Sequence, residues 1–266
     1  MRYCLNYNRI TEKMNCLRQV NEWTIDYNPK DNTLLLFLNK YKDKRINLYI
    51  KEKDINFTFL EELCNQFPQL YIKFAFDKKI LLNLKKKKIR FFFDLLIDNW
   101  DSLQEVVKLG VSDIYITNDL AFDLNNLSRE VHKINDKCQI RVYCNIAQSA
   151  WVLQEQNSLR SFFIRPEDVD LYEKYIDVLE FYGVDEKLET YYKIYAIDKK
   201  WMGQLNEIIL NLNSEIDGKY ILENFARRRM VCGKKCQKGS NCRWCELIDK
   251  VSSSLGKSKL IVSSRK

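Results

Sequence analysis

The middle of the chain alternates between two patterns of apolar and polar positions. Short runs rich in β-branched and aromatic residues are typical of buried strands, and apolar residues that return every three or four positions are typical of amphipathic helices. Runs of the first kind predict seven strands, at residues 46–50, 70–76, 89–95, 113–117, 139–144, 161–165 and 178–182.

Helical spacing fills the segments between these runs. It predicts helices at residues 59–67, 77–88, 100–109, 124–134 and 166–176. Two of them carry signals at their ends: Gly110 follows the third, where glycine ends many helices, and Pro166 opens the fifth, where proline fits the first turn. Strands and helices therefore succeed one another as repeated βα units.

This succession predicts a parallel sheet. The expected strands are apolar at nearly every position, as in the run from Ile89 to Leu95, which is typical of a sheet with both faces covered. Seven such units, with a further strand at residues 3–7, predict an α/β fold of the TIM-like (β/α)8 barrel class. The alternative is an open, doubly wound sheet. Nucleotide-binding sheets of that class usually carry a glycine-rich phosphate loop, and the chain contains neither of its two common forms.

The first 44 residues have a less regular pattern. Besides the strand at 3–7, they predict a helix at residues 10–23 and a hairpin whose strands, 24–27 and 34–38, flank a turn. The sequence leaves open whether this part belongs to the barrel. We expect residues 1–183 to form the barrel. Residues 184–266 are expected to form a helical extension with a long helix at 185–213, a cysteine-rich segment and a basic tail.

Composition favours a globular protein with an anionic partner. Of the 266 residues, 46% are hydrophobic, and only seven are glycine and three proline, which argues against disorder. The net charge of +8 indicates a partner that carries negative charge. The first residues lack the apolar core of a signal peptide, and no apolar run approaches the ~18 residues of a membrane span. We therefore expect a soluble, cytoplasmic protein without a membrane partner.

Four cysteines lie close together near the end of the chain. Cys232, Cys236, Cys242 and Cys245 have the spacing C-x3-C-x5-C-x2-C. Four thiolates at such spacing are the ligands that a tetrahedral Zn²⁺ or a [4Fe-4S] cluster requires, and the sequence does not choose between the two. Two local disulfides are the alternative, but thiols inside cells are normally kept reduced. The segment is therefore predicted to bind a metal.

Basic residues surround these cysteines and point to nucleic acid. Cations can contact phosphates, and an aromatic ring can stack on a base. The predicted contact residues are Arg227, Arg228, Arg229, Lys234, Lys235, Arg243 and Trp244. The alternative is electrostatic, because four thiolates leave a zinc site with a net charge of −2 that nearby cations would stabilise without any partner.

A second candidate site is expected at the carboxyl ends of the barrel strands, where barrels of this class carry their chemistry. Asp94, Asn145, Arg165 and Glu180 follow or end four different predicted strands. Together they could bind a polar substrate or supply acid–base groups. Each of them could instead cap a helix or close a turn, because Asp, Asn and Arg are common at such positions.

Three runs of the chain resemble a known family. The run QIRVYCNIAQS begins at Gln139, SFFIRPEDV begins at Ser161, and VLEFYG begins at Val178. They resemble the second half of the peptidase U32 (collagenase-like) family, over about residues 89–183. The resemblance implies a barrel, and in several members an oxygen-independent hydroxylation of RNA bases or quinone precursors with a [4Fe-4S] cluster on four cysteines. Arg165 stands where that family usually has serine. The four cysteines of the family are also more widely spread along the chain than the four here.

Two hypotheses follow for the function. The first is a U32-like barrel that contains a metal or an iron–sulfur cluster and acts on RNA, by a base modification such as hydroxylation. The second is a non-catalytic module that binds nucleic acid or protein through a structural zinc knuckle on a barrel scaffold. In both, RNA is favoured over DNA as the nucleic acid.

Overall fold

The computed structural model describes most of the first 230 residues. The described residues are 1–10, 14, 20–75, 77, 80, 83–84, 87–97, 99–116, 120, 123–147, 163–183, 185–212, 217–218 and 225–230. Within them, all the ladders of the sheet are parallel, and the strand order is β5-β4-β3-β2-β1-β9-β8-β7-β6. The strands are β1 (Arg2–Tyr7), β2 (Glu22–Asp26), β3 (Arg45–Ile50), β4 (Leu70–Phe74), β5 (Phe91–Phe93), β6 (Leu96–Ile97), β7 (Asp113–Ile116), β8 (Gln139–Tyr143) and β9 (Val178–Phe181).

The two ends of this sheet meet. Strands β5 and β6 are separated only by Asp94 and Leu95, so they are two segments of one strand position. The first segment pairs with β4 and the second with β7, and the amide of Ser112 donates to the carbonyl of Phe91 at 3.1 Å. The result is a nearly closed parallel barrel of eight strand positions in sequential order. The prediction of a TIM-like α/β barrel is confirmed, and the open sheet is excluded.

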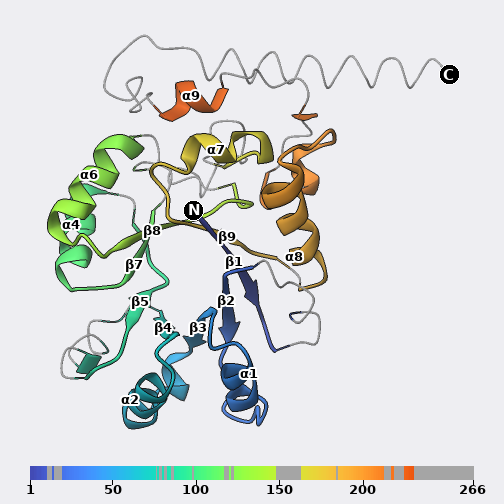
Figure 1. The fold of residues 1–266 in the computed structure, drawn as a ribbon. Coiled ribbons are helices and arrows are strands. Elements are labelled where there is room, and N and C mark those ends of the chain that lie inside the picture. The colour runs from blue at the N-terminus through green and yellow to red at the C-terminus, as the bar shows by residue number, and fades with distance from the viewer. Residues whose placement is uncertain are drawn as a thin grey trace, which may run out of the picture.

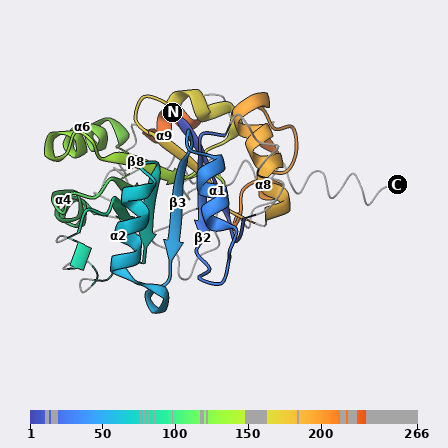
Figure 2. The same cartoon turned by 60° about the horizontal axis from the view of Figure 1, so that its bottom comes forward.

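Helices surround the strands on the outside (Figure 1). Helices α1 and α2 lie outside the barrel next to β2 and β3, as Figure 2 shows from another side. Asparagine side chains begin two of the helices, because Asn56 accepts from the amide of Phe59 and Asn99 from that of Ser102. The α-helices are α1 (Leu34–Lys40), α2 (Phe57–Gln66), α4 (Trp100–Lys108), α6 (Leu124–Ile134), α7 (Val169–Tyr172), α8 (Asp185–Tyr192) and α9 (Phe225–Met230). Shorter turns of helix are η2 (Glu52–Asp54), η3 (Pro166–Asp168), η4 (Lys193–Asp198, a π-helix) and η5 (Leu205–Glu207).

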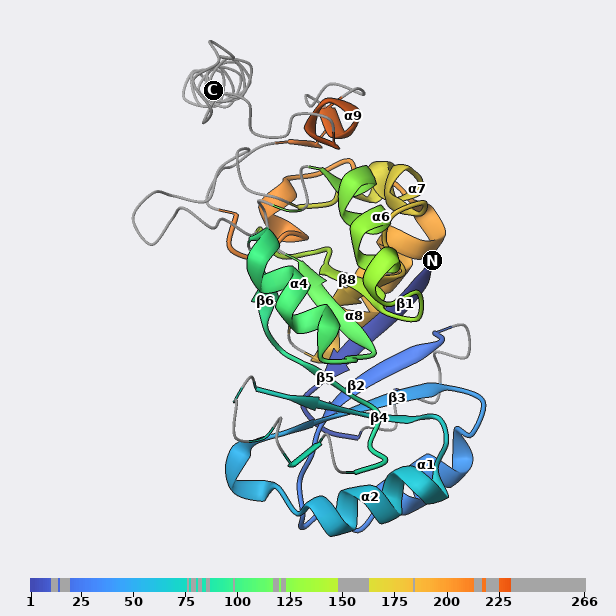
Figure 3. The same cartoon turned by 90° about the vertical axis from the view of Figure 1, so that its left-hand side faces the viewer.

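The main hydrophobic core lies between the outer face of the barrel and these helices. Every second strand residue faces outward, and these residues are apolar and buried, as Leu48, Ile72 and Leu179 are. They pack with the apolar stripes of the helices, such as Leu63 of α2 and Val131 of α6. In Figure 3 the helices lie on both sides of the crossing strands, which is where this core is placed.

The inner face of the barrel is different, because most of its buried residues are polar or charged. Among the described residues, the buried side chains that face inward include Cys4, Glu22, Thr24, Asn47, Lys73, Phe92, Asp113, Tyr115, Arg141, Tyr143 and Glu180. Only one small apolar cluster is distinct from the main core in the described residues, and it consists of Phe92, Tyr115 and Tyr143. The expectation of strands that are apolar at nearly every position was therefore wrong. The strands alternate, with apolar residues outward and polar or aromatic residues inward.

Two of the predicted strands were also wrong. Residues 34–38 belong to helix α1, in which Leu34, Phe37 and Leu38 share one buried face at helical spacing, so no hairpin forms. Residues 163–165 are not in a strand, and 161–162 lie outside the described residues. The eighth strand of the barrel is instead β2, which pairs in parallel with β1 and β3. The first part of the chain is thus part of the barrel.

The long helix predicted after the barrel is shorter than expected. Helix α8 continues as a π-helix to Asp198 and ends at Lys199, whose φ of 48° is left-handed and cannot continue a right-handed helix. None of the helices in the described part of the chain is long and apolar enough to cross a bilayer.

Candidate active site at the barrel mouth

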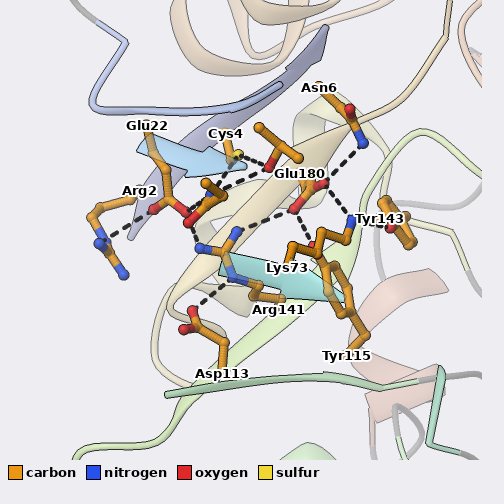
Figure 4. A network of polar contacts seen from close by, with 12 residues as sticks. Arg2, Cys4, Asn6, Glu22, Lys73, Asp113, Tyr115, Arg141, Tyr143 and Glu180 are labelled. Atoms are coloured by element: carbon orange, nitrogen blue, oxygen red, sulfur yellow. Dashed lines mark hydrogen bonds and ion pairs between the residues drawn. The ribbon is translucent and has the colours of Figure 1, made fainter. Parts of the chain in front are cut away.

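The polar residues inside the barrel form one connected network, which Figure 4 shows from close by. Its centre is Glu180 on β9, which is fully buried and receives four hydrogen bonds. The donors to its carboxylate are Tyr115 at 2.6 Å, Arg141 at 3.1 Å, Asn6 at 3.2 Å and Lys73 at 3.3 Å. Burial alone would raise the pKa of Glu180, but the charges of Lys73 and Arg141 and these hydrogen bonds outweigh it and lower the pKa. Glu180 is therefore held as an anion.

Arg141 on β8 connects Glu180 to the deeper part of the barrel. Its guanidinium is fully buried and pairs with three carboxylates, those of Glu22, Asp113 and Glu180. The contact with Asp113 is 2.7 Å long. A planar guanidinium with five donors can serve several carboxylates at once, which a lysine ammonium cannot do in the same geometry.

The amino end of the barrel closes the network with two more arginines. Arg45 reaches Asp113 at 2.5 Å and Glu22 at 3.4 Å, and Arg2 reaches Glu22 at 3.3 Å. Together the interior carries four basic groups, Arg2, Arg45, Lys73 and Arg141, and four acidic groups, Glu22, Asp94, Asp113 and Glu180, all of them joined by ion pairs. Four charges of each sign cancel, so the barrel interior is close to neutral although it is ionic.

At the carboxyl end, the network reaches solvent through Lys73, Tyr143 and Asp94. The Lys73 ammonium donates to the Tyr143 hydroxyl at 2.9 Å and lies 3.2 Å from Asp94 and 3.3 Å from Glu180. Tyr143 in turn donates to Asp94 at 2.8 Å. The side chain of Lys73 is 2% exposed and that of Asp94 is 33% exposed. Asp94 is therefore the solvent-facing end of a chain of buried, hydrogen-bonded groups.

The protonation of this chain follows from its surroundings. Burial lowers the pKa of Lys73, but Glu180, Tyr143 and Asp94 outweigh that and raise the pKa well above its usual range, so the group is an ammonium ion. Burial raises the pKa of both Tyr143 and Tyr115, so both remain neutral phenols that donate hydrogen bonds. The site thus offers a fixed positive charge, a neutral phenol and one accessible carboxylate.

Aromatic rings line this end of the barrel. The rings of Tyr115 and Tyr143 lie 4.6 and 5.3 Å from the Lys73 ammonium, and that of Tyr49 lies at 5.8 Å. Tyr182, just beyond β9, sets its ring edge-on to Tyr143 at 6.1 Å and is nevertheless 49% exposed. An exposed ring that packs edge-on against a tyrosine of the network is a surface on which a planar group could stack.

Of the four residues that the sequence placed at the strand ends, the structure brings Asp94 and Glu180 together on Lys73. Asn145 binds the backbone of Tyr182 twice, donating to its carbonyl at 2.7 Å and accepting from its amide at 2.9 Å. Asn145 therefore fixes the position of the exposed Tyr182.

Arg165 forms its ion pair on its own segment of the chain. It forms a buried, bidentate ion pair with Asp168, at 2.5 and 2.8 Å, across the first turn of η3. Its guanidinium also lies 5.7 Å from the ring of Phe225 in α9. These contacts fasten the segment before α7.

The predicted metal and nucleic-acid residues fall mostly outside the described residues. Arg227 is exposed on α9, and Arg228 and Arg229 belong to the same helix. The remaining ones lie in the part of the chain that is not described: Cys232, Lys234, Lys235, Cys236, Cys242, Arg243, Trp244 and Cys245. Within the described ranges, four cysteines are buried free thiols, and no group of three His, Cys, Asp or Glu residues could hold a metal ion.

Tyr143 and Arg141 are the site residues that the strand-end rule did not select, whereas Lys73 near the end of β4 is among the strand-end positions. Arg141 is the middle residue of β8, whereas the rule selects residues at or beyond the carboxyl end, and Tyr143 ends the strand but counts as one of its apolar residues. A usable signal was present, because polar residues recur at every second position in several strands, as in Glu22-Trp-Thr-Ile-Asp26 and Gln139-Ile-Arg141. This alternation marks a polar inner face.

Neither the protein-family models nor the curated proteins gave a match to this chain. The resemblance to the peptidase U32 family therefore stays a prediction, and the case for function depends on the geometry of the barrel mouth.

Proposed function

We propose that this protein is an enzyme whose active site is the carboxyl mouth of the barrel, with Asp94 as the acid–base group that meets the substrate. The observation that carries the proposal is the contrast in exposure between hydrogen-bonded neighbours: Asp94 is one-third exposed, while Lys73 beneath it is almost completely buried. A buried ammonium at a strand end stabilises negative charge in a site from which water is largely excluded.

The chemistry supported by this arrangement is proton transfer. Asp94 accepts a proton from a substrate, or returns one, while Tyr143 donates a hydrogen bond to its carboxylate. Lys73 holds Tyr143 in place and supplies a positive charge next to any anion that develops. Glu180 neutralises Lys73 from the buried side, so the ammonium does not have to take a counterion from solvent.

For the substrate class we propose a base in RNA. Three features support it: the resemblance to a family with RNA-modifying members, the net charge of +8, and the exposed ring of Tyr182 beside the site. Base–aromatic stacking contributes about 1–3 kcal/mol per base, so a ring fixed at the mouth of the site could hold a flipped base. Modification of the base, such as hydroxylation, is the reaction that the resemblance implies.

The proposal includes a metal centre on the four C-terminal cysteines. Its support is the spacing of Cys232, Cys236, Cys242 and Cys245 alone. Anaerobically purified protein should contain either one zinc or about four iron and four sulfide per chain, and a cluster of this kind absorbs near ~400 nm. Cys242→Ser and Cys245→Ser should each lose that metal. Protein that contains neither metal after anaerobic purification would remove this part of the proposal.

The experiment that tests the enzyme proposal compares the nucleosides of cellular RNA. RNA from the source cell with and without the gene is digested and analysed by mass spectrometry. We expect one modified nucleoside to disappear with the gene and to return with the wild-type gene but not with Asp94→Asn or Lys73→Met. Asp136→Asn is the control, because this exposed acid follows α6 at the opposite end of the barrel.

The second candidate function is the non-catalytic binding module. It predicts that no nucleoside changes when the gene is removed, while RNA binding persists in Asp94→Asn. The two candidates are separated by Asp94: an enzyme needs its carboxylate, whereas a scaffold with an ionic interior does not need an exposed one.

A further inference from the structure

A pocket lies beside the barrel mouth and has no role in the site described above. Its volume is about 420 Å³, and it is formed by the segments that follow β1, β2 and β3. Asn8 follows the first strand, Asp26 to Lys30 end and follow the second, and Lys51, Lys53 and Asp54 follow the third. These segments come from carboxyl strand ends, so the pocket opens on the same end of the barrel as Asp94.

The pocket is rich in lysine. Lys30, Lys51 and Lys53 line it together with two acids, Asp26 and Asp54, which leaves a net charge of +1. Lys51 pairs with Asp26 at 3.7 Å. Lys30 and Lys53 form no ion pair with any residue that the structure describes, and both are exposed. Two ammonium groups with all their donors available therefore face one hollow.

The backbone around the pocket is held in place without a ligand. The amide of Tyr27 donates to the carbonyl of Tyr49 at 2.8 Å, which continues the pairing of β2 and β3 beyond the strands. The amide of Lys30 donates to the side chain of Asn28 at 3.0 Å, which fixes the turn that carries this lysine. A pocket that is already shaped loses little conformational entropy when it binds.

The pocket is connected to the catalytic residues by register. Asp26 is paired with Tyr49 and Tyr49 with Lys73 on three successive strands, and all three face inward. Neighbouring strands are about 4.8 Å apart, so the Cα atoms of Asp26 and Lys73, two strands apart, are separated by about 10 Å. On the other side, Asn8 donates to Asp185 through both its backbone and its side chain, at 3.2 and 3.3 Å, close to the exposed Tyr182.

From this geometry we propose that the pocket is a phosphate site, in which Lys30, Lys51 and Lys53 bind a phosphate group of the substrate whose base lies at Asp94. The inference rests on the proposed function, since it names the part of the substrate that the mouth does not hold. The phosphate could belong to a polynucleotide backbone or to a single nucleotide, and the chemistry of recognition is the same.

Asp26 is the group that adjusts when the anion binds. Burial raises its pKa, and Lys51 and Lys73 oppose that effect without cancelling it. This carboxylate is therefore protonated more readily than an exposed one, which reduces its repulsion of an incoming phosphate. When the phosphate binds, the Lys51 ammonium breaks its ion pair with Asp26 and forms one with the phosphate.

The test measures binding to two probes, a single-stranded ribo-oligonucleotide of about eight nucleotides and a mixture of the four nucleoside 5′-monophosphates. The full-length variant Lys30→Ala/Lys51→Ala/Lys53→Ala should bind the oligonucleotide at least about tenfold more weakly than the wild type. The slope of the logarithm of its binding constant against the logarithm of the salt concentration should be about two units less steep, near 0.7 for each phosphate contact. If weakening appears for the oligonucleotide alone, the source is a backbone phosphate. If it appears for both probes, a single nucleotide is enough.

The matched control removes the same charge from the other end of the barrel. Lys108, Lys133 and Lys137 are exposed at or just beyond the carboxyl ends of α4 and α6, which lie at the amino ends of the strands. Their triple alanine variant should bind both probes within about twofold of wild type, because long-range charge effects are screened over about 10 Å. Equal weakening by both triple variants would overturn the phosphate site.

The outcome also separates this inference from the function on which it rests. If Asp94→Asn abolishes the nucleoside modification while the Lys30/Lys51/Lys53 variant binds like the control, the pocket is overturned and the enzyme remains. If Asp94→Asn leaves the modification intact and the lysine variant still loses binding, the phosphate site is supported and the proposed catalytic role of Asp94 is overturned.

Discussion

Both faces of the barrel sheet are largely buried, but they are stabilised in different ways. On the outer face, side chains such as Leu179 and Ile72 are buried against other apolar groups. Their stabilisation depends on how well their shapes pack, and not on one specific partner. On the inner face, the ion pair between Arg141 and Glu180 replaces the water that would hydrate their charges. Each of these side chains therefore depends on specific partners. Burial therefore does not identify which kind of interaction stabilises a strand residue.

The inner face is also the more vulnerable of the two. A hydrophobic neighbour can shift slightly when an outer residue is truncated, which limits the loss. A buried carboxylate that loses its cation cannot be compensated in this way, because no water replaces the missing hydrogen-bond donor. The inner network is therefore more sensitive than the outer core to a single substitution.

The largest expected effect is that of Arg141→Met. The substitution keeps much of the side-chain volume but leaves Glu22, Asp113 and Glu180 without their shared cation. Removing one partner of a buried ion pair typically lowers the free energy of unfolding by about 3–5 kcal/mol, and urea denaturation should show a loss of that size or a failure to fold. Arg129→Met is the control, because its ion pair with Glu130 is exposed and contributes about 0–1 kcal/mol. Similar losses in the two variants would remove the contrast between the faces.

A smaller effect is expected from the coupling between Lys73 and Glu180, which are 3.3 Å apart and both buried. A double-mutant cycle with Lys73→Met and Glu180→Gln should give a coupling free energy of about 0.5–3 kcal/mol. The same cycle between Lys73→Met and Leu179→Ala, an outward-facing neighbour in sequence, should give additive losses. Additivity in the first cycle would mean that the inner residues act independently, as outer ones do.

Acid should reduce the stabilisation that the ion pairs of the inner face contribute. The folded-state pKa of Glu180 lies below its usual value of 4.5, so the unfolded chain takes up this proton first. The stabilisation from the ionised carboxylate is therefore complete above about pH 4.5 and is lost as the pH falls through the folded-state value. Denaturation of the wild type and of Glu180→Gln should show a stability difference that shrinks below about pH 4.5. A difference that stays constant down to about pH 3 would contradict the assignment.

The smallest effect on stability is expected at the mouth, where the network meets solvent. Tyr182→Ala removes a half-exposed ring and should change the free energy of unfolding by about 0.5 kcal/mol or less. If the ring is a stacking surface, the same variant should bind the ribo-oligonucleotide more weakly by about 1–3 kcal/mol, and Tyr182→Phe should bind normally. Equal binding by Tyr182→Ala and the wild type would show that the ring has no part in recognition.

Much of the fold could be predicted because its outer face follows simple periodicity. Helix α6 was predicted to the residue, since its apolar stripe is regular and polar residues, Asp123 and Asn135, flank it. The failures occurred where local pattern was ambiguous. The short apolar run from Leu34 to Leu38 fits both a strand and a helix, and only its packing beside β2 and β3 decides between them.

The candidate site was harder to predict because it depends on partners far apart in sequence. Asp94, Glu180 and Lys73 all stand at or near predicted strand ends, but nothing in the sequence shows that these three side chains meet. That contact requires the register of four strands, β4, β5, β8 and β9, and their closure into a ring. Asn145 and Arg165 have the same residue types as catalytic groups, and only their hydrogen bonds distinguish a positioning role from a chemical one.

The order of the strands also determines when the interior can lose its water. Strand β1 pairs with β9, so Arg2 lies beside Val178 and the ring closes only after the last strand of the barrel has joined. The contacts of the network span large separations, 119 residues between Glu22 and Arg141 and 107 between Lys73 and Glu180. Proteins rich in such non-local contacts fold slowly. During synthesis on the ribosome, we therefore expect the inner charges of the first seven strand positions to stay hydrated until β9 is added and completes the buried network.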